Sequence, residues 1–462
     1  MENQNRELFE SVPVKKALLK MSVPTVISQL IALVYNVVDT FFIGRTGNAY
    51  MVAAVSLSFP IFMFTIAISN LFGTGGGSLM ARLSGRHEDK YAKSTCAYSF
   101  FCSLLTACLY SAIVFIFLTP VLNLLGASEK TMPYAKQYIW LVVIIGNIPT
   151  VVSSTMAHLL RNAGFSKQAS LGLSMGGILN IILDPLLMFV LLPEGYEVMG
   201  AAAATMLSNT IACIFLFCKI HSLSCKTVLS TSLKDARAIR KQDKRQIYSV
   251  GLPSSSLNAL YDITILILNY LMAKHGDLQL AAIGLVLKIE RLPNAINIGL
   301  CQGMLPIIAY NYSSGNSTRM KETQRITRKW ILYVCIITTA MYELAARPIC
   351  GFFLNTSTSN SELALETIAY AVIFLRIRSF QSFPQSMNFH PSFTLQAMGK
   401  GKETFIHSLC RQCVFSIPAM FILNIFFAEK GLVAAILLGE TLGAILAHIL
   451  LFRVQKKEAV AY

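Results

Sequence analysis

The sequence predicts an all-α membrane protein with twelve transmembrane helices in two pseudo-symmetric six-helix lobes, and three observations support this fold class. Of the 462 residues, 54% are hydrophobic and 13% are charged, whereas soluble domains carry about 25% charged residues. The apolar residues form long blocks, such as 100–118 and 263–272. These blocks belong to helices of roughly 20 residues, the length that crosses a ~30 Å hydrocarbon layer. The second half of the chain also repeats motifs of the first.

Twelve segments are long and apolar enough to span the membrane. They are residues 22–43, 53–78, 95–118, 135–157, 168–192, 200–219, 248–272, 279–309, 330–350, 364–388, 404–427 and 431–452. The mean hydropathy of the chain, +0.57, is that of a multi-span membrane protein. The first ten residues are polar and lack an apolar core followed by small residues, so we expect no cleaved signal peptide.

The formal net charge of +16 is a topology signal. Most of the 39 Lys and Arg residues lie in the N-terminus, in the even-numbered loops between the spans and in the C-terminal tail. Loops that are rich in Lys and Arg stay on the cytoplasmic side of a membrane. We therefore expect a multi-pass protein of the bacterial cytoplasmic (inner) membrane with both termini in the cytoplasm. The expected partner of these charges is the lipid bilayer, not nucleic acid.

The longest polar segment divides the chain almost evenly and predicts its organisation. The predicted parts are a cytoplasmic N-terminus (1–21), an N-lobe of spans 1–6 (22–220), a cytoplasmic linker loop (221–247), a C-lobe of spans 7–12 (248–452) and a cytoplasmic tail (453–462). Glycines align the two lobes: Gly47 matches Gly276, and Gly164 matches Gly399 within a shared L-x-x-x-G-x-x-K pattern. Self-similarity of this kind indicates an internal repeat.

Two six-span repeats in the same orientation are typical of secondary transporters, whose lobes rock around a central cavity. The sequence has no G-x-x-x-x-G-K-[ST] motif, the phosphate-binding loop of ATP-driven proteins. Energy must then come from an ion gradient or a partner subunit, and we expect neither enzymatic activity nor a cofactor. The glycine-rich run at 73–77 has no Lys after it and indicates close helix packing or a hinge.

Two carboxylates lie within spans of the first half, where ionisable groups are costly and usually functional. Asp39 is in span 1, and Asp184 is in span 5, one helical turn after Asn180. Pro185 removes a backbone donor and frees a carbonyl oxygen. Such oxygens suit Na⁺, whereas burial and mutual repulsion of the carboxylates would favour a proton carrier. The alternative is a pair of structural hydrogen bonds.

The second half does not repeat this acidic site, because Phe415 and Ala419 occupy the positions that align with Asn180 and Asp184. Its candidates for the cavity wall are Asp262, Glu290, Arg411 and Glu440. Glu290 needs a partner from another helix, and Arg411 with Glu440 is a candidate ion pair. For most of these residues we favour structural neutralisation or a place in a polar cavity wall over a functional role. Asp262 is the one to single out for function, since its own span has no basic neighbour.

The chain resembles the multidrug and toxic compound extrusion (MATE) family, in its bacterial drug-export branch. The resemblance runs from residue 22 to residue 452. It is carried by SVPTVISQLIALVYNVVDTFFIG, LFGTGGGSLMARLSGR and LRNAGFSKQASLGLSMGGILNIILDPLLMF, and in the second half by GLCQGMLPIIAYNYSSGN and SLCRQCVFSIP. It implies twelve spans in two lobes and drug efflux driven by influx of H⁺ or Na⁺.

The resemblance also implies roles for individual residues. It assigns the cation or proton site to Asp39, Asn180, Asp184 and Thr205, with Na⁺ held by the first three if the protein is sodium-coupled. It makes Pro24 a hinge at which span 1 bends. Some members use acids in spans 7 and 10. Asp262 matches the first only loosely, and span 10 carries Arg376 and Arg378 with no acid.

The sequence therefore favours a cation-coupled antiporter that exports organic, often cationic, drugs by alternating access. With 28 Phe, 18 Met and 17 Tyr, the chain can build an adaptable apolar cavity for amphipathic small molecules. We expect a monomer. One alternative is a lipid-linked sugar flippase of the same superfamily, which clustering of Arg376, Arg378 and Arg411 in the cavity would favour. Another is an inactive membrane scaffold, and a major-facilitator transporter is a weaker rival because the loop between spans 2 and 3 lacks that family's motif.

Overall fold

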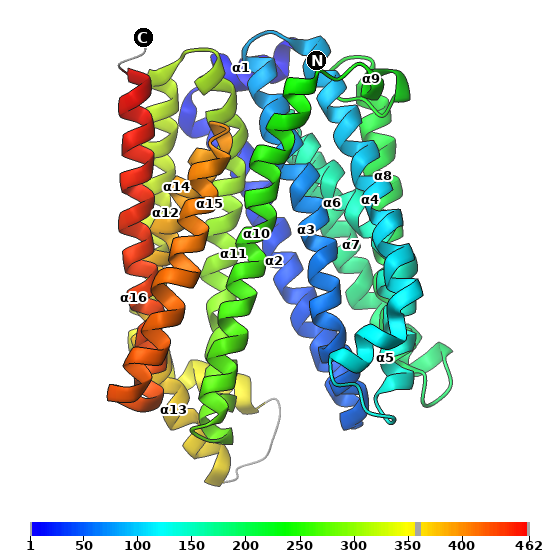
Figure 1. The fold of residues 1–462 in the computed structure, drawn as a ribbon, viewed down its shortest axis with the longest axis vertical. Helices are drawn as coiled ribbons and strands as arrows, with labels where there is room; N and C mark the ends of the chain where they lie inside the picture. Colours follow the sequence, from blue (N-terminus) through cyan, green and yellow to red (C-terminus); the bar gives the residue numbers. More distant parts are fainter. Residues whose placement is uncertain (1, 356–361, 460–462) are drawn as a thin grey trace.

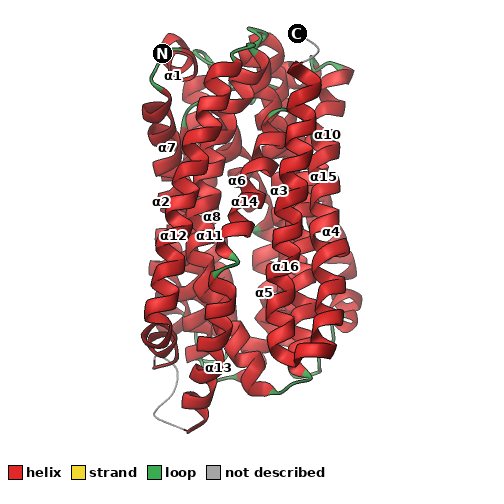
Figure 2. Cartoon of the chain, turned by 90° about the vertical axis from the view of Figure 1, so that its left-hand side faces the viewer, coloured by secondary structure: helices red, strands yellow, loops and turns green. Residues whose placement is uncertain are grey.

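The computed structural model describes residues 2–355 and 362–459, and within these ranges the chain is almost entirely helical and has no strand. The helices stand side by side in one elongated bundle (Figure 1). Most of the loops lie at the two ends of the bundle (Figure 2). Both termini lie at the same end, at the top of Figure 1, which we call the terminal end. The expectation of an all-α fold is confirmed.

The first half of the chain forms eight α-helices and two short π-helical segments. They are α1 (Glu2–Glu10), α2 (Val14–Arg45), α3 (Ala49–Gly85), α4 (Asp89–Leu124), α5 (Met132–Ile139), η1 (Trp140–Ile145), α6 (Asn147–Asn162), α7 (Ser166–Leu186), η2 (Leu187–Leu191) and α8 (Glu197–Ser224).

The second half begins with a short helix in the linker and continues through the remaining spans. Its elements are α9 (Leu233–Arg237), α10 (Lys241–Ala273), α11 (Asp277–Ser313), α12 (Ser317–Asn355), α13 (Glu362–Ser379), α14 (Ser382–Ala397), α15 (Gly401–Leu409), η3 (Cys410–Ser416) and α16 (Ile417–Ala459).

Among the described residues, nine helical stretches are long and apolar enough to cross a membrane, and the pair Met132–Ile145 and Asn147–Asn162, bent by 46°, makes a tenth. One of the nine, Gly401–Glu458, holds two spans: it descends from the terminal end and returns (Figure 1). The reversal lies at Ala428, whose φ of 49° breaks the helix. Helices α13 and α14 together cross the bundle as well. The predicted twelve-span architecture is thereby confirmed.

Several helices extend past the predicted spans, chiefly at the terminal end. Helix α10 starts at Lys241, and α9 forms within the predicted loop 221–247, so only part of that loop is irregular. Arg240 fixes it by ion pairs to Asp243, at 2.6 Å, and to Glu88 at the start of α4, at 2.8 Å. The linker therefore packs against the N-lobe.

The internal repeat is visible in the backbone at matching turns. Gly47 and Gly276, which precede the second helix of each lobe, have positive φ angles of 68° and 139°. Gly164 and Gly399 have φ angles of 88° and 79°. Each ends a helix in the same way, because the residue after it donates to the carbonyl five residues earlier, at 2.9 Å in the N-lobe and 2.8 Å in the C-lobe. A side chain would be strained at these left-handed positions, which explains why both copies keep glycine.

The two lobes meet through α2 against α11 and α3 against α10. Glycine permits the close approach: a Cβ atom added at Gly75 would lie 2.4 Å from the carbonyl oxygen of Ile247, and one added at Gly303 would lie 2.6 Å from the Cα atom of Ser22. A buried apolar cluster at the terminal end also joins helices of both lobes, from Leu8 to Val454. The glycine-rich run therefore serves helix packing, as the sequence predicts.

We expect Gly75→Ala to lower the stability of the folded protein by about 1–3 kcal/mol, because the methyl group meets backbone and the helices α3 and α10 must separate. The measurement is the apparent melting temperature of the purified protein in detergent. Gly284→Ala in α11 is the matched control, since nothing lies within 4 Å of a Cβ atom there. Equal melting temperatures for the two variants would contradict the interpretation.

Candidate functional site

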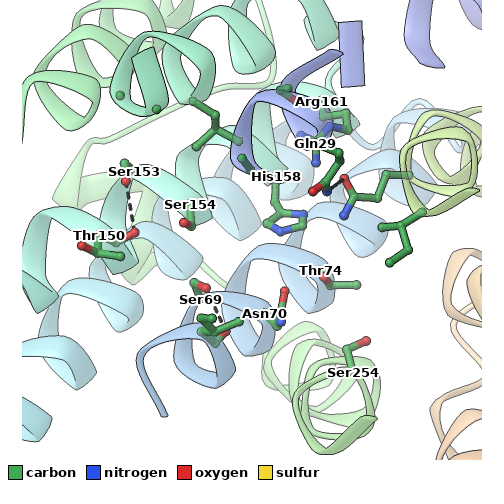
Figure 3. A pocket seen from close by; sticks show the side chains of 18 of the residues that line it. Gln29, Ser69, Asn70, Thr74, Thr150, Ser153, Ser154, His158, Arg161 and Ser254 are labelled. Atoms are coloured by element: carbon green, nitrogen blue, oxygen red, sulfur yellow. Dashed lines mark hydrogen bonds between the residues drawn. The ribbon is translucent and has the colours of Figure 1, made fainter. Parts of the chain in front are cut away.

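A cavity of about 450 Å³ lies between the lobes. Its walls come from α2, α3, α6, α7 and α8 of the N-lobe and from α10, α11 and α14 of the C-lobe. Hydroxyl and amide side chains such as Asn70, Thr74 and Ser154 point into it (Figure 3). Phe62, Phe389 and other apolar groups complete the wall. A cavity of this size and mixed lining can hold a drug-sized molecule, and we call it the central cavity.

The side chains of Asn180, Asp184 and Thr205 form a hydrogen-bonded group beside the central cavity. The amide nitrogen of Asn180 donates to Asp184 Oδ1 at 3.2 Å and to Thr205 Oγ1 at 3.3 Å. Asn180 and Thr205 line the cavity, while Asp184 is 0% exposed behind them. The spacing of one helical turn between Asn180 and Asp184 creates the first contact, and packing of α8 on α7 supplies Thr205.

Asp39 on α2 lies near this group, without a hydrogen bond to it among the described residues. Its carboxyl group interacts electrostatically with that of Asp184, because α2 packs along α7. We call Asp39, Asn180, Asp184 and Thr205 the acidic site. The structure thus brings together the four residues that the sequence analysis selected.

The acidic site holds three buried oxygen atoms that accept no hydrogen bond from the described residues. They are Asp39 Oδ1, Asn180 Oδ1 and Asp184 Oδ2. Buried acceptors without partners are rare in folded proteins and call for a donor or a cation. A hard cation suits these three atoms because hard cations prefer oxygen ligands. A proton on either carboxyl group would instead occupy one of the carboxyl oxygen atoms. Among the described residues, no cluster of three or more His, Cys, Asp and Glu forms a transition-metal site.

Two tyrosines that the sequence analysis did not select lie near the acidic site. Tyr35 on α2 and Tyr138 on α5 both lie within electrostatic range of Asp39 and Asp184. Tyr35 also lines the central cavity. It stands one helical turn before Asp39, and that spacing is the only sequence signal that could have found it.

Pro24, the predicted hinge, lies within α2, which is a single helix from Val14 to Arg45. The hydroxyl groups of Thr25 and of Ser166 on α7 both donate to the carbonyl oxygen of Met21, at 2.9 and 2.6 Å. These contacts hold the proline turn against the N-lobe. One conformation is described, so bending at Pro24 stays a prediction.

The C-lobe candidates do not line the central cavity. Glu290 accepts two hydrogen bonds from Arg378, at 2.7 and 2.6 Å. Glu440 accepts two from Arg411, at 3.0 and 2.7 Å, and this predicted ion pair is confirmed. Neither pair is among the residues of the cavity wall, because each carboxylate is turned toward an arginine between packed helices. The two pairs neutralise buried charge within the C-lobe.

Asp262 also lies outside the wall of the central cavity. It is half-buried on α10 and interacts electrostatically with Arg291 of α11. Arg291 is thus within electrostatic range of Asp262, but the two form no ion pair among the described residues. All four C-lobe candidates for the cavity wall therefore lie outside it, contrary to the prediction.

The charge that does line the central cavity is Arg161, which falls between the predicted spans 135–157 and 168–192 and was therefore expected in a cytoplasmic loop. Helix α6 continues to Asn162, and Arg161 is 3% exposed on its cavity face together with His158. Figure 3 shows both side chains close to that of Gln29. The two residues are three apart and therefore share a helix face, a signal that was present in the sequence.

Comparisons with known proteins bear on this architecture. The family model MatE matches residues 24–186 and 253–422. The multidrug export protein MepA of Staphylococcus saprophyticus is 28% identical over 463 residues, which cover 100% of this chain and 98% of that protein. MepA of Staphylococcus aureus strain MRSA252 is 27% identical with the same coverage.

Solved structures share the fold. A MATE protein in complex with MaL6 superposes with a TM-score of 0.90 at 22% identity, covering 97% of this chain and 99% of that one. An outward-facing multidrug resistance MATE family transporter gives 0.89 at 22%, covering 97% and 98%. A transporter of the MOP superfamily from Pyrococcus furiosus, described as having a binding pocket of reverse polarity, gives 0.85 at 23%, covering 96% of each chain.

Proposed function

The chain belongs to the MatE family, and from that premise we propose that it is an antiporter that exports amphipathic organic compounds in exchange for H⁺ or Na⁺. The multidrug export proteins named MepA, which it matches over its whole length, support export of drugs. The coupling rests on the acidic site, which holds three buried oxygen atoms without a hydrogen-bond donor among the described residues and reaches the central cavity through Asn180 and Thr205. No cofactor other than the coupling ion is required.

The geometry supports a simple coupling scheme. Asp39 and Asp184 bind the ion, while Asn180 and Thr205 stand between that ion and the central cavity. A bound cation neutralises the repulsion between the two carboxylates and lets the helices that carry them draw closer. The state that favours the ion then differs from the state that favours the substrate, which is the condition for exchange.

We further place the terminal end in the cytoplasm, because most Lys and Arg residues outside the spans lie at that end. The lobe contacts at Gly75 and Gly303 and the cluster from Leu8 to Val454 then close the cytoplasmic side. The structure would accordingly be an outward-facing state. A multi-pass monomer in the bacterial inner membrane is the corresponding localisation and assembly, with no role for nucleic acid.

The flippase alternative finds no support in the arginines that suggested it. Arg378 pairs with Glu290, Arg411 with Glu440, and Arg376 lies 4.0 Å from Glu343. None of the three is in the wall of the central cavity. A scaffold without transport would not need a polar cavity beside a buried acidic site.

Transport into proteoliposomes under separately imposed Na⁺ and pH gradients tests the proposal. We expect two amphipathic dyes, ethidium and rhodamine 110, to accumulate on the side from which the coupling ion flows, under one of the two gradients. Protein-free liposomes with the same gradients are the control. Accumulation that needs neither gradient would exclude ion coupling, and no accumulation under either gradient would favour the scaffold.

A further inference from the structure

The central cavity has an electrostatic character that a site for simple cations would not have. Among the described residues its lining contains no Asp and no Glu, and its one formally charged member is Arg161. The guanidinium group makes no ion pair and no hydrogen bond within the part of the chain that the structure describes, and its Nε atom is buried without an acceptor. A buried charge without a partner is costly, so the arginine is poised for an acceptor that enters with a ligand.

The neighbours of Arg161 are fixed and do not compete for it. Asn162 donates to the carbonyl oxygen of His158 at 2.9 Å. His158 packs against Gly73, and Asn162 packs against Gly77, where an added Cβ would collide with each side chain. The carbonyl oxygen of Arg161 already accepts from the backbone of Gly164 at 3.1 Å. The guanidinium group is therefore held at the cavity wall and is not used to cap its own helix.

Amide groups offer further hydrogen bonds from the opposite lobe. Gln29 donates to the side-chain oxygen of Gln302 at 3.2 Å, which links α2 to α11 and leaves the amide nitrogen of Gln302 able to donate. Both residues line the central cavity, as does Gln396 of α14. An anionic oxygen near Arg161 thus finds a cation in one lobe and amide donors in the other.

We propose that Arg161 anchors an anion-binding subsite within the central cavity, which takes the carboxylate of a zwitterionic or anionic amphipathic substrate. The guanidinium fork matches a carboxylate through two parallel hydrogen bonds. The apolar body of the substrate lies against aromatic groups such as Phe62 and Phe389. This inference rests on the proposed function, in that the central cavity is the substrate site, and it narrows the substrate class from cations to compounds that carry an anionic group.

A matched pair of dyes tests the subsite by equilibrium binding. Rhodamine 110 carries a free carboxylate, and rhodamine 123 is its methyl ester, so the pair differs in that one charge. Fluorescence anisotropy with the purified protein in detergent needs no ion gradient, so a failure of coupled transport and a failure of the subsite give separate results. We expect the wild type to bind rhodamine 110 more tightly than rhodamine 123.

Arg161→Gln should weaken binding of rhodamine 110 roughly 10- to 100-fold, the range for losing a charged hydrogen-bonded pair, and leave rhodamine 123 unchanged or tighter. Arg161→Lys should restore part of the loss, because it keeps the charge without the fork. Lys167→Gln, on an exposed position at the start of α7, is the control and should change neither affinity. The wild-type preference alone remains a test if Arg161→Gln does not fold.

Adding sodium chloride distinguishes the source of the anion, with binding of rhodamine 123 as the control for ionic strength. Competition between chloride and rhodamine 110 would show that the subsite also accepts a free inorganic anion, which supports it. Binding independent of chloride would show that the subsite takes the substrate carboxylate alone, which supports it as well. Equal affinity of the wild type for the two dyes, or equal loss of both dyes in Arg161→Gln, would overturn the proposal.

Discussion

An Asp39→Asn variant is expected to lose ion-driven export by roughly 100-fold or more, the upper range of a coupling free energy, while remaining folded. The amide keeps the shape of the side chain but cannot exchange a proton or balance the charge of Na⁺. Asp184→Asn should show the same loss, because both carboxyl groups bind the same ion. The double variant should therefore lose little more export than either single variant. Export of rhodamine 110 from proteoliposomes under the active gradient is the measurement.

The stability of these variants gives an independent readout. Asp39 and Asp184 each carry a buried oxygen atom without a hydrogen-bond donor among the described residues, which costs folding free energy. We therefore expect melting temperatures in detergent that are equal to or higher than that of the wild type. Loss of export then reflects lost ion binding and not unfolding.

Asp262→Asn is the matched control for the acidic site. This third carboxylate also lies in an apolar span, but it is outside the central cavity and interacts with Arg291. We expect export by Asp262→Asn to remain within about twofold of the wild type, because this half-buried carboxyl group lies outside the central cavity and forms no ion pair among the described residues. Undiminished export by Asp39→Asn would refute the coupling role, and loss in Asp262→Asn would place a second site in the C-lobe.

The features that could be predicted from the sequence are those that depend on local pattern. Runs of apolar residues define the spans because a helix must satisfy its backbone hydrogen bonds inside the bilayer. Gly164 and Gly399 align because the same left-handed turn ends both helices. Asp39 and Asp184 could be selected because a carboxylate in an apolar span is energetically costly and is usually functional.

The features that could not be predicted depend on how helices rotate against each other. Glu290 and Arg378 are 88 positions apart, and either could have faced lipid, cavity or another helix. Arg161 was assigned to a loop because hydropathy falls at the end of span 4, although α6 runs on to Asn162. Tyr35 could not be distinguished from the other tyrosines, since only packing of α2 on α7 brings it near Asp184.

Glu290→Gln is expected to lower the stability of the folded protein by about 3–5 kcal/mol, the cost of breaking a buried ion pair from one side. Arg378 is 0% exposed and makes both of its carboxylate hydrogen bonds to Glu290, at 2.7 and 2.6 Å. Its Nη1 atom has no acceptor among the described residues even in the intact pair. Without the carboxylate, a buried guanidinium charge would remain uncompensated. The measurement is the apparent melting temperature in detergent.

The double variant Glu290→Gln with Arg378→Met separates a structural pair from a functional one. Removing both charges removes the uncompensated charge, so we expect most of the lost stability to return, with a coupling energy that a double-mutant cycle measures. Because neither residue lines the central cavity, export should recover along with stability. A double variant that is stable but exports nothing would contradict structural neutralisation. The Glu290–Arg378 pair would then take part in the movement between states, and ion coupling could no longer be confined to the N-lobe.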